Sequence, residues 1–129
     1  MPRTFTSVFS EQDDFQTAVS EDGVVGFLVT GCGQFRARLT QIALHRLRLA
    51  AGEEELSRVA FITVPAGMTL VLLPIGGRPS PVWGGIETRT GEMMTFGPGE
   101  RVHARTGGPC GWGAVQVPAE EILSNMAAR

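Results

Sequence analysis

Few side chains in this 129-residue sequence could carry out chemistry, and their types exclude several reaction classes. The sequence contains no lysine, which excludes a Walker-type phosphate loop and Schiff-base catalysis. It contains no tyrosine either, so no phenol is available as an acid or base. Two histidines, His45 and His103, and two cysteines, Cys32 and Cys110, remain as candidate ligands or nucleophiles. Because a zinc or iron site needs more well-placed ligands than these, we expect no metal and no cofactor.

Other catalytic arrangements also lack their parts. The sequence has no Gly-X-Ser-X-Gly elbow, which argues against a serine-based triad. Glu87 and Glu92 could act as an acid–base pair, but both flank a turn, where charged side chains are common. Gly31-Cys32-Gly33 begins like a dinucleotide-binding motif, yet Arg36 stands where the third glycine belongs. We therefore expect a protein that is not an enzyme.

The charge of the chain argues against nucleic-acid binding by this segment. The formal net charge is −2 and the sequence pI is about 5.6, whereas nucleic-acid-binding domains usually present a basic face. The apolar stretch from Met68 to Ile75 is too short to span a membrane, and Met1 leads into no signal peptide. We expect a cytoplasmic protein that contacts no membrane.

The spacing of glycine and apolar residues predicts many short strands between two helices. The chain has 17 glycines, most of them between short apolar runs, which is typical of β proteins. A first helix is expected over 11–20 with Ser10 as its N-cap, and a second begins at Pro118. We expect eight to ten strands, covering 24–30, 35–40, 46–49, 59–64, 68–75, 82–88, 92–96, 102–106 and 111–117, with a polar turn at 51–55.

These elements predict one mostly-β domain over residues 1–129. The best architecture is an antiparallel jelly-roll (double-stranded β-helix) barrel with short N-terminal and C-terminal helices. The alternation of apolar and polar residues that begins at Phe35 is interrupted at residues 41–44, which indicates a bulge or a corner between two strands. The strand over 68–75 is apolar apart from Thr69, so we expect it to be buried on both faces. The outward positions of two strands carry Arg36, Arg38, Arg46 and Arg48.

The jelly-roll class includes the cupins, so their metal-binding signature can be compared with this sequence. The first cupin motif needs His-X-His, which is absent. The second motif has a glycine, five residues, Pro-X-Gly, two residues and a histidine, and Gly91 followed by Gly97-Pro98-Gly99 resembles it. Val102 then occupies the histidine position, and His103 comes one residue late. If Val102 points into the barrel, His103 points out, because neighbouring strand residues face opposite sides.

Several short motifs, taken in order, resemble one family. They are Phe35-Arg36-Ala37-Arg38-Leu39, Pro81-Val82-Trp83-Gly84-Gly85, the run from Gly97 to His103, and Gly108-Pro109-Cys110-Gly111-Trp112-Gly113. From Phe9 to Ile122 the chain resembles the N-terminal cupin-like domain of AraC-type bacterial transcriptional regulators.

The resemblance implies a barrel without metal that senses a small effector and helps two subunits pair. In that family a linker and two helix-turn-helix units follow this domain and bind DNA, so DNA would be a partner only through a part that this sequence lacks. The chain is either a piece of such a regulator or a free-standing sensor domain. The last helix has no glycine or proline stop, which favours the first alternative.

Strand alternation and residue type suggest which side chains would bind an organic effector. Apolar lining is expected from Phe61, Leu72, Trp83, Met94 and Trp112, with Arg38 or His103 as the polar anchor. The stripe Ile122, Leu123 and Met126 is expected to be buried on the barrel or across a homodimer.

Two alternatives to the sensor remain open. A small cupin enzyme, an isomerase or dioxygenase, would need a metal or an acid–base pair inside the barrel. A structural oligomerisation domain would have a fully packed barrel and no effector.

Overall fold

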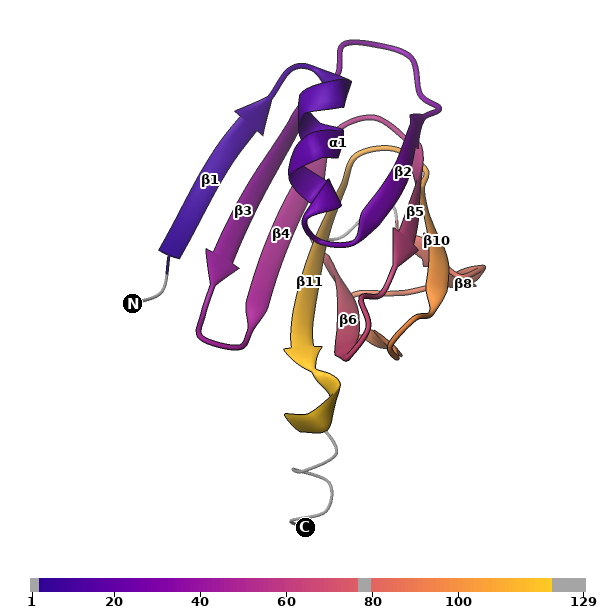
Figure 1. Cartoon of the computed structure of the whole chain (residues 1–129). Coiled ribbons are helices and arrows are strands. Elements are labelled where there is room, and N and C mark those ends of the chain that lie inside the picture. Colours follow the sequence, from indigo (N-terminus) through magenta and orange to yellow (C-terminus); the bar gives the residue numbers. More distant parts are fainter. Residues whose placement is uncertain (1–2, 77–79, 122–129) are drawn as a thin grey trace.

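Two antiparallel β-sheets and one helix make up the part of the chain that the computed structural model describes, residues 3–76 and 80–121 (Figure 1). The six-stranded sheet has the order β1-β3-β4-β11-β6-β9, formed by β1 (Arg3–Phe9), β3 (Ala37–Ala43), β4 (Arg48–Glu54), β11 (Cys110–Pro118), β6 (Met68–Ile75) and β9 (Met94–Phe96). The five-stranded sheet has the order β2-β5-β10-β7-β8, formed by β2 (Val24–Val29), β5 (Arg58–Thr63), β10 (Arg101–Thr106), β7 (Val82–Trp83) and β8 (Ile86–Glu87). All strand pairings are antiparallel, which confirms the expected mostly-β jelly-roll class.

The core lies between the two sheets because each strand alternates inward and outward side chains. In β10, Val102, Ala104 and Thr106 are buried, while Arg101, His103 and Arg105 are exposed. In β6 the inward residues Leu70, Leu72 and Pro74 are buried. The expected opposition of Val102 and His103 is therefore confirmed.

The helix α1 (Gln12–Ser20) closes one side of the space between the sheets and packs against β1 and β2 (Figure 1). Its buried residues, Phe15 and Val19, are four positions apart and so lie on one face. The Phe15 ring lies 5.4 Å from that of Phe9 and 5.5 Å from that of Phe27, centroid to centroid. This aromatic cluster joins the helix to both sheets.

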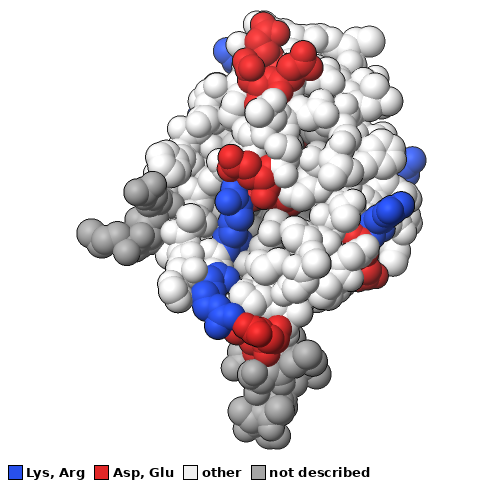
Figure 2. Space-filling model, in the orientation of Figure 1, with Lys and Arg blue, Asp and Glu red and all other residues white. Residues whose placement is uncertain are grey.

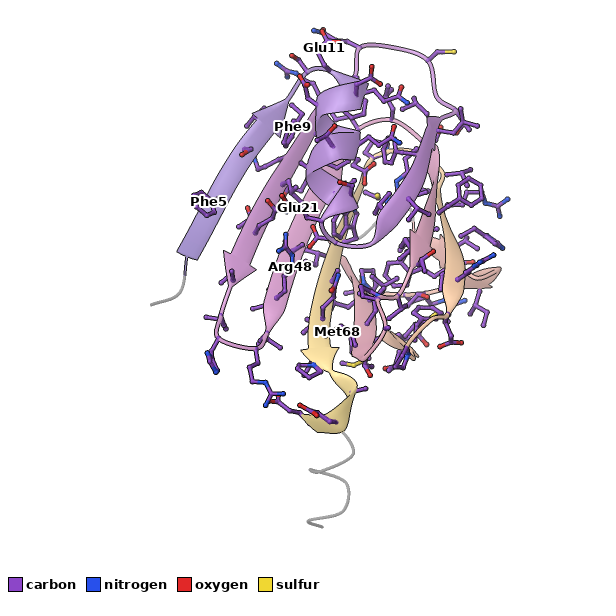
Figure 3. All side chains as sticks on the ribbon, in the orientation of Figure 1. Phe5, Phe9, Glu11, Glu21, Arg48 and Met68 are labelled. Carbon is purple, nitrogen blue, oxygen red and sulfur yellow. The ribbon has the colours of Figure 1, made fainter. Side chains whose placement is uncertain are left out.

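The turn after α1 is fixed to the six-stranded sheet by charged side chains. Asp22 is buried, and its carboxylate accepts hydrogen bonds from Arg48 Nε at 2.8 Å and from Gln41 Nε2 at 3.1 Å. Arg48 also pairs with Glu21 at 2.9 Å, and Figure 3 shows these two side chains meeting between β4 and the end of α1. Figure 2 shows acidic and basic side chains in contact on this face of the molecule.

Several expected elements differ in the structure. The N-cap of α1 is Glu11 rather than Ser10, and its side chain makes no capping hydrogen bond. The expected turn at 51–55 lies mostly within β4, because Glu54 points inward to partners described below. The expected strand at 82–88 is instead the short hairpin of β7 and β8, since Gly84 and Gly85 have positive φ values of 60° and 83° that suit a tight turn.

Two further differences concern the ends of the chain. The sequence did not predict β1, which pairs along its whole length with β3. Pro118 ends β11, and the helical turn begins one residue later, at residue 119. The stripe Ile122, Leu123 and Met126 lies outside the described residues. Within residues 3–76 and 80–121, no helix has the length and apolar character needed to cross a membrane.

Candidate functional site

A hydrogen-bonded group of three side chains lies inside the barrel. Glu54 at the end of β4 and Arg58 at the start of β5 are only 3% and 5% exposed. The Arg58 guanidinium donates to both Glu54 carboxylate oxygens, through Nε and Nη2, each at 2.9 Å. Trp112 on β11 donates its indole N–H to Glu54 Oε2 at 2.6 Å. We call Glu54, Arg58 and Trp112 the interior polar cluster.

Further contacts hold the Arg58 guanidinium in place. Its Nη1 donates to the main-chain oxygen of Ala104 on β10 at 2.8 Å. Its Cζ atom lies 5.8 Å from the centre of the Phe27 ring, within range of a cation–π contact. The planar guanidinium thus links strands of both sheets, with a bidentate carboxylate on one side and a carbonyl on the other.

The position of Trp112 depends on a glycine in the neighbouring strand. Gly52 on β4 lies opposite Trp112 in the register of the sheet. A Cβ atom at residue 52 would lie 2.7 Å from Trp112 Nε1 and closer still to the ring carbons. The indole therefore lies directly against the backbone of Gly52, in a position from which its N–H reaches Glu54.

The space left beside the interior polar cluster is small. The cavity has a volume of about 30 Å³, close to that of one water molecule. Its lining combines the polar cluster with apolar side chains from both sheets and the helix, among them Phe15, Phe27, Leu72, Trp83 and Ala114. In this conformation the barrel is almost filled by its own side chains.

Three of the predicted lining residues come together in this interior. Leu72, Trp83 and Trp112 are 4%, 2% and 9% exposed, and all three line the cavity. Met94 on β9 is half-buried and packs against the core, but it is not among the residues that line the cavity. Whether any of these side chains binds an effector stays a prediction.

Phe61, Arg38 and His103 are not placed inside the barrel. Phe61 is 49% exposed on the outer side of β5, because Ala60 and Ile62 occupy the inward positions on either side of it. Arg38 and His103 are exposed for the same reason, with Ala37, Leu39, Val102 and Ala104 turned inward beside them. The expected place of Phe61 in the inner lining is wrong, because Phe61 belongs to the outward set of its strand. Arg38 and His103 lie on the outward positions expected from strand alternation, so neither side chain reaches the interior as a polar anchor.

Glu54 and Arg58, the charged side chains that do face the interior, were not predicted from the sequence as site residues. Glu54 lies in the run Glu53-Glu54-Glu55, which is typical of a solvated turn, and Arg58 directly precedes an apolar strand. The alternation of inward and outward positions could have identified both residues. Gly52 and Glu54 follow Ala50 at every second position, so they share its inward orientation. Arg58 lies two and four positions before the inward residues Ala60 and Ile62 and therefore also points inward.

Cys110 adjoins the interior polar cluster and is half-buried at the start of β11. Burial raises the pKa of its thiol to about 11, and the negative charge of Glu54 acts in the same direction. Cys32 is exposed, and both cysteines are free thiols. Within residues 3–76 and 80–121, no three His, Cys, Asp or Glu side chains are grouped as metal ligands would be. The expected lack of a metal stays a prediction.

A second, larger hollow lies on the outside of the six-stranded sheet. Its volume is about 560 Å³, and its lining includes Val8, Arg38, Glu53, Ile75 and Gly111. These five residues are register partners in adjacent strands, so they form one row across the sheet.

The two facing antiparallel sheets, with their inner surfaces packed together, define a cupin-fold domain. No protein-family model and no curated protein matches the sequence. Among solved structures, the AraC-like transcriptional activator CuxR is similar, with a TM-score of 0.72 and 16% sequence identity. The likeness covers 97% of this chain and 51% of CuxR, so the chain spans about half the length of that protein. The cupin domain of Schizosaccharomyces pombe Cnp3 is also similar, with a TM-score of 0.50, 5% identity and coverage of 70% of this chain and 71% of that one.

Proposed function

We propose that this chain is a non-catalytic domain of an AraC-type transcriptional regulator that senses a small molecule and supports dimerisation. The observation that carries the proposal is the interior polar cluster, because buried charges add little stability and converging polar groups in an apolar interior suit ligand recognition. The likeness of nearly the whole chain to about half of an AraC-like activator supports the regulatory context. DNA binding would belong to a part outside this sequence.

The geometry indicates how an effector would be recognised. Leu72 and Trp83 offer apolar surface, while Arg58 and the Trp112 indole offer hydrogen-bond donors. Because the cavity holds only about 30 Å³, an effector must displace a side chain. Trp112 is the best placed to move, since one hydrogen bond to Glu54 anchors its polar end. Effector binding would therefore exchange the Trp112–Glu54 contact for contacts with the ligand.

Intrinsic fluorescence tests this proposal directly. The chain has two tryptophans and no tyrosine, and both Trp83 and Trp112 line the cavity, so all of its tryptophan emission reports on the interior. Small carboxylates, sugars and aromatic compounds would be titrated while emission and the thermal midpoint are recorded. A true effector should change the emission and raise stability by about 3 kcal/mol at a hundred times its Kd.

Two variants sharpen that experiment. Trp112→Phe keeps an aromatic ring at this position but removes the indole donor, and it should weaken effector binding. Leu28→Ala, on an exposed residue of β2, should leave binding unchanged. Equal binding to both variants would place the ligand elsewhere, and no response from the wild-type chain to any compound would count against a sensor.

A structural oligomerisation domain is the second candidate. The observation that favours it is the small volume of the interior cavity, about 30 Å³, which is what a fully packed barrel would leave. In that case no compound would shift the emission or the thermal midpoint, yet the chain would still associate in sedimentation experiments.

A further inference from the structure

Each of the two sheets ends in two edge strands, and three of these four edges are protected against pairing with another strand. In the described part of the chain, β9 has three residues and β8 has two, so neither offers a long edge. The register of β2 is interrupted by a bulge between Val24 and Gly26. Short edge strands and bulges are common means by which proteins prevent edge-to-edge association.

The fourth edge strand, β1, has none of these protections. It is seven residues long and pairs with β3 without any shift of register. Residues 4–9 include no charged residue and no proline, and residues 4–8 are all exposed. No described helix or strand lies beyond β1 (Figure 1). A long, regular edge of this kind offers its main-chain donors and acceptors to another strand.

The register shows which main-chain groups of β1 face away from the sheet. The main-chain N–H of Glu55 donates to the main-chain oxygen of Arg36, so the even-numbered residues of β3 point their main-chain groups toward β4. The odd-numbered residues of β3 therefore bond to β1, and their partners in β1 are also odd-numbered. The N–H and C=O groups of Thr4, Thr6 and Val8 are left on the outer side, and we call them the free edge.

Apolar side chains of β1 are also left without cover. Val8 is 72% exposed and Phe5 is 59% exposed. Phe5 lies on the core side of the sheet, opposite Gln41, but the helix contacts the other end of the strand, where the Phe9 ring packs against Phe15. Figure 3 shows Phe5 on β1, away from the helix. A strand added at the free edge would lie next to both exposed side chains.

A second copy of β1 matches the free edge under a two-fold axis perpendicular to the sheet. With the axis at Thr6, the central residue of the strand, Thr6 faces Thr6 of the second copy and Thr4 faces Val8. All seven residues are then paired, which no other position of the axis achieves. Each free-edge residue would exchange both of its main-chain hydrogen bonds with the residue opposite, because its N–H and C=O point outward.

The side chains on both faces suit this register. On the outer face, the hydroxyl oxygens of Thr6 and Thr40 lie 3.1 Å apart, and the two central threonines would continue this row of hydroxyls across both copies. On the core side, Phe5 would lie opposite Ser7 of the second copy, and this small residue leaves room for the ring. The two Phe5 rings would then be diagonal neighbours, within reach of each other.

We propose that β1 is the dimerisation edge of this chain: two copies pair their β1 strands antiparallel around Thr6 and join their six-stranded sheets into one. The occupant is a second copy because the strand matches its own reversed sequence, with threonine on threonine at the centre and no like charges opposite each other. This inference rests on the dimerisation part of the proposed function, and effector binding plays no part in it.

A charge at the centre of β1 tests the pairing. Thr6→Glu places two carboxylates directly opposite each other across the two-fold axis, so sedimentation velocity should show a dimer weakened at least about fivefold. Leu28→Glu is the matched control, because Leu28 is 59% exposed on a strand of the other sheet and should leave the dimer intact. Circular dichroism of each variant verifies that the chain is folded.

Paired substitutions on the outer face test the register. Within one strand Thr4 and Val8 are about 13 Å apart, so they meet only between copies. Thr4→Glu with Val8→Glu should weaken the dimer at least as much as Thr6→Glu does. Thr4→Glu with Val8→Arg should dimerise about as strongly as the wild type, because each carboxylate then faces a guanidinium of the other copy.

A proline tests the main-chain bonds. Thr6→Pro removes an N–H of the free edge and no hydrogen bond between β1 and β3, so the folded chain should lose its dimer. A dimer of unchanged affinity in both Thr6→Glu and Thr6→Pro would overturn the inference while leaving dimerisation itself in place, and its loss in Met126→Glu would assign pairing to the C-terminal stripe. A wild-type chain that is monomeric at all concentrations would refute both, and the fluorescence test of effector sensing would still stand on its own.

Discussion

The contact between Gly52 and Trp112 shows that the absence of a side chain at residue 52 determines where the indole lies. Because the indole lies against the residue 52 backbone, Gly52→Ala must push it away from Glu54. We expect a loss of about 2–3 kcal/mol from overpacking and the broken hydrogen bond. Urea unfolding followed by fluorescence measures the loss, and the emission of the folded variant should shift to longer wavelength.

Gly107→Ala is the control for that substitution. Nothing lies within 4 Å of a Cβ atom placed at residue 107, and its φ is not in the left-handed region. This variant should be within about 0.5 kcal/mol of the wild type. Equal effects at residues 52 and 107 would contradict the packing account.

The interior polar cluster should respond strongly to the loss of one charge. Glu54→Gln leaves the Arg58 guanidinium buried without its counter-charge, so we expect a loss of about 3–5 kcal/mol. The exposed pair of Arg46 and Glu120 provides the comparison, and Glu120→Gln should cost less than about 1 kcal/mol. Chemical denaturation of both variants checks the difference.

A double substitution tests whether the charge or the packing matters in this cluster. Replacing both partners, in Glu54→Leu with Arg58→Met, should recover much of the stability lost in Glu54→Gln, because no buried charge is left unpaired. If the double variant is less stable than the single one, the ion pair itself stabilises the fold.

Cys110 should make stability depend on alkaline pH. Its thiol pKa of about 11 in the folded chain is above the usual value of 9.0, so the folded state disfavours the thiolate. The contribution of this thiol to stability is therefore complete below about pH 9 and is lost as the pH rises toward 11. Urea midpoints between these pH values should fall less in Cys110→Ala than in the wild type. Cys32→Ala, at an exposed thiol, should behave like the wild type.

At the scale of elements, α1 is held by the aromatic cluster around Phe15. Phe15 is completely buried, so Phe15→Ala should cost about 3–5 kcal/mol. Phe5→Ala removes the same ring from β1, where it is 59% exposed, and should cost less than about 1 kcal/mol. Thermal unfolding by circular dichroism compares the two. A small effect of Phe15→Ala would mean that α1 is not needed to close the barrel.

Elements with a clean apolar period could be predicted from the sequence. The sequence predicts the strand over Met68–Ile75 with its observed bounds, since a run that is apolar apart from Thr69 ends at Gly76. The corner between β3 and β4 was expected at 41–44 but falls at 44–47, where Leu44 and Leu47 are joined by a main-chain hydrogen bond, because residues 41–43 continue β3 in regular register. These elements depend on local pattern, which the sequence carries.

Elements that depend on distant contacts could not be predicted in the same way. The strand β1 has no strong apolar pattern and exists because β3 offers a free edge along all of its length. The end of β4 looks like a turn until Arg58 and Trp112 supply partners for Glu54. For the candidate site, alternation correctly placed Trp83 and Trp112 inside, but the polar groups that accompany them are visible only in three dimensions.

At the scale of the whole molecule, the two sheets share one core and should unfold together. Trp83 belongs to the five-stranded sheet and Trp112 to the six-stranded one, yet both line the same cavity. Trp83→Phe and Trp112→Phe each leave a single tryptophan that reports on one sheet. In each variant, the fluorescence midpoint should coincide with the midpoint from circular dichroism. Separate midpoints within one variant would show that the sheets unfold independently.

The close contact between Trp112 and Gly52 also limits which amino-acid replacements this domain can accept during evolution. A side chain at residue 52 and a large ring at residue 112 compete for the same space, so neither position can change freely while the other is kept. In relatives that share this barrel, a larger residue at the first position should accompany a smaller one at the second. Such paired replacements would leave a barrel whose interior lacks the indole N–H donor to residue 54.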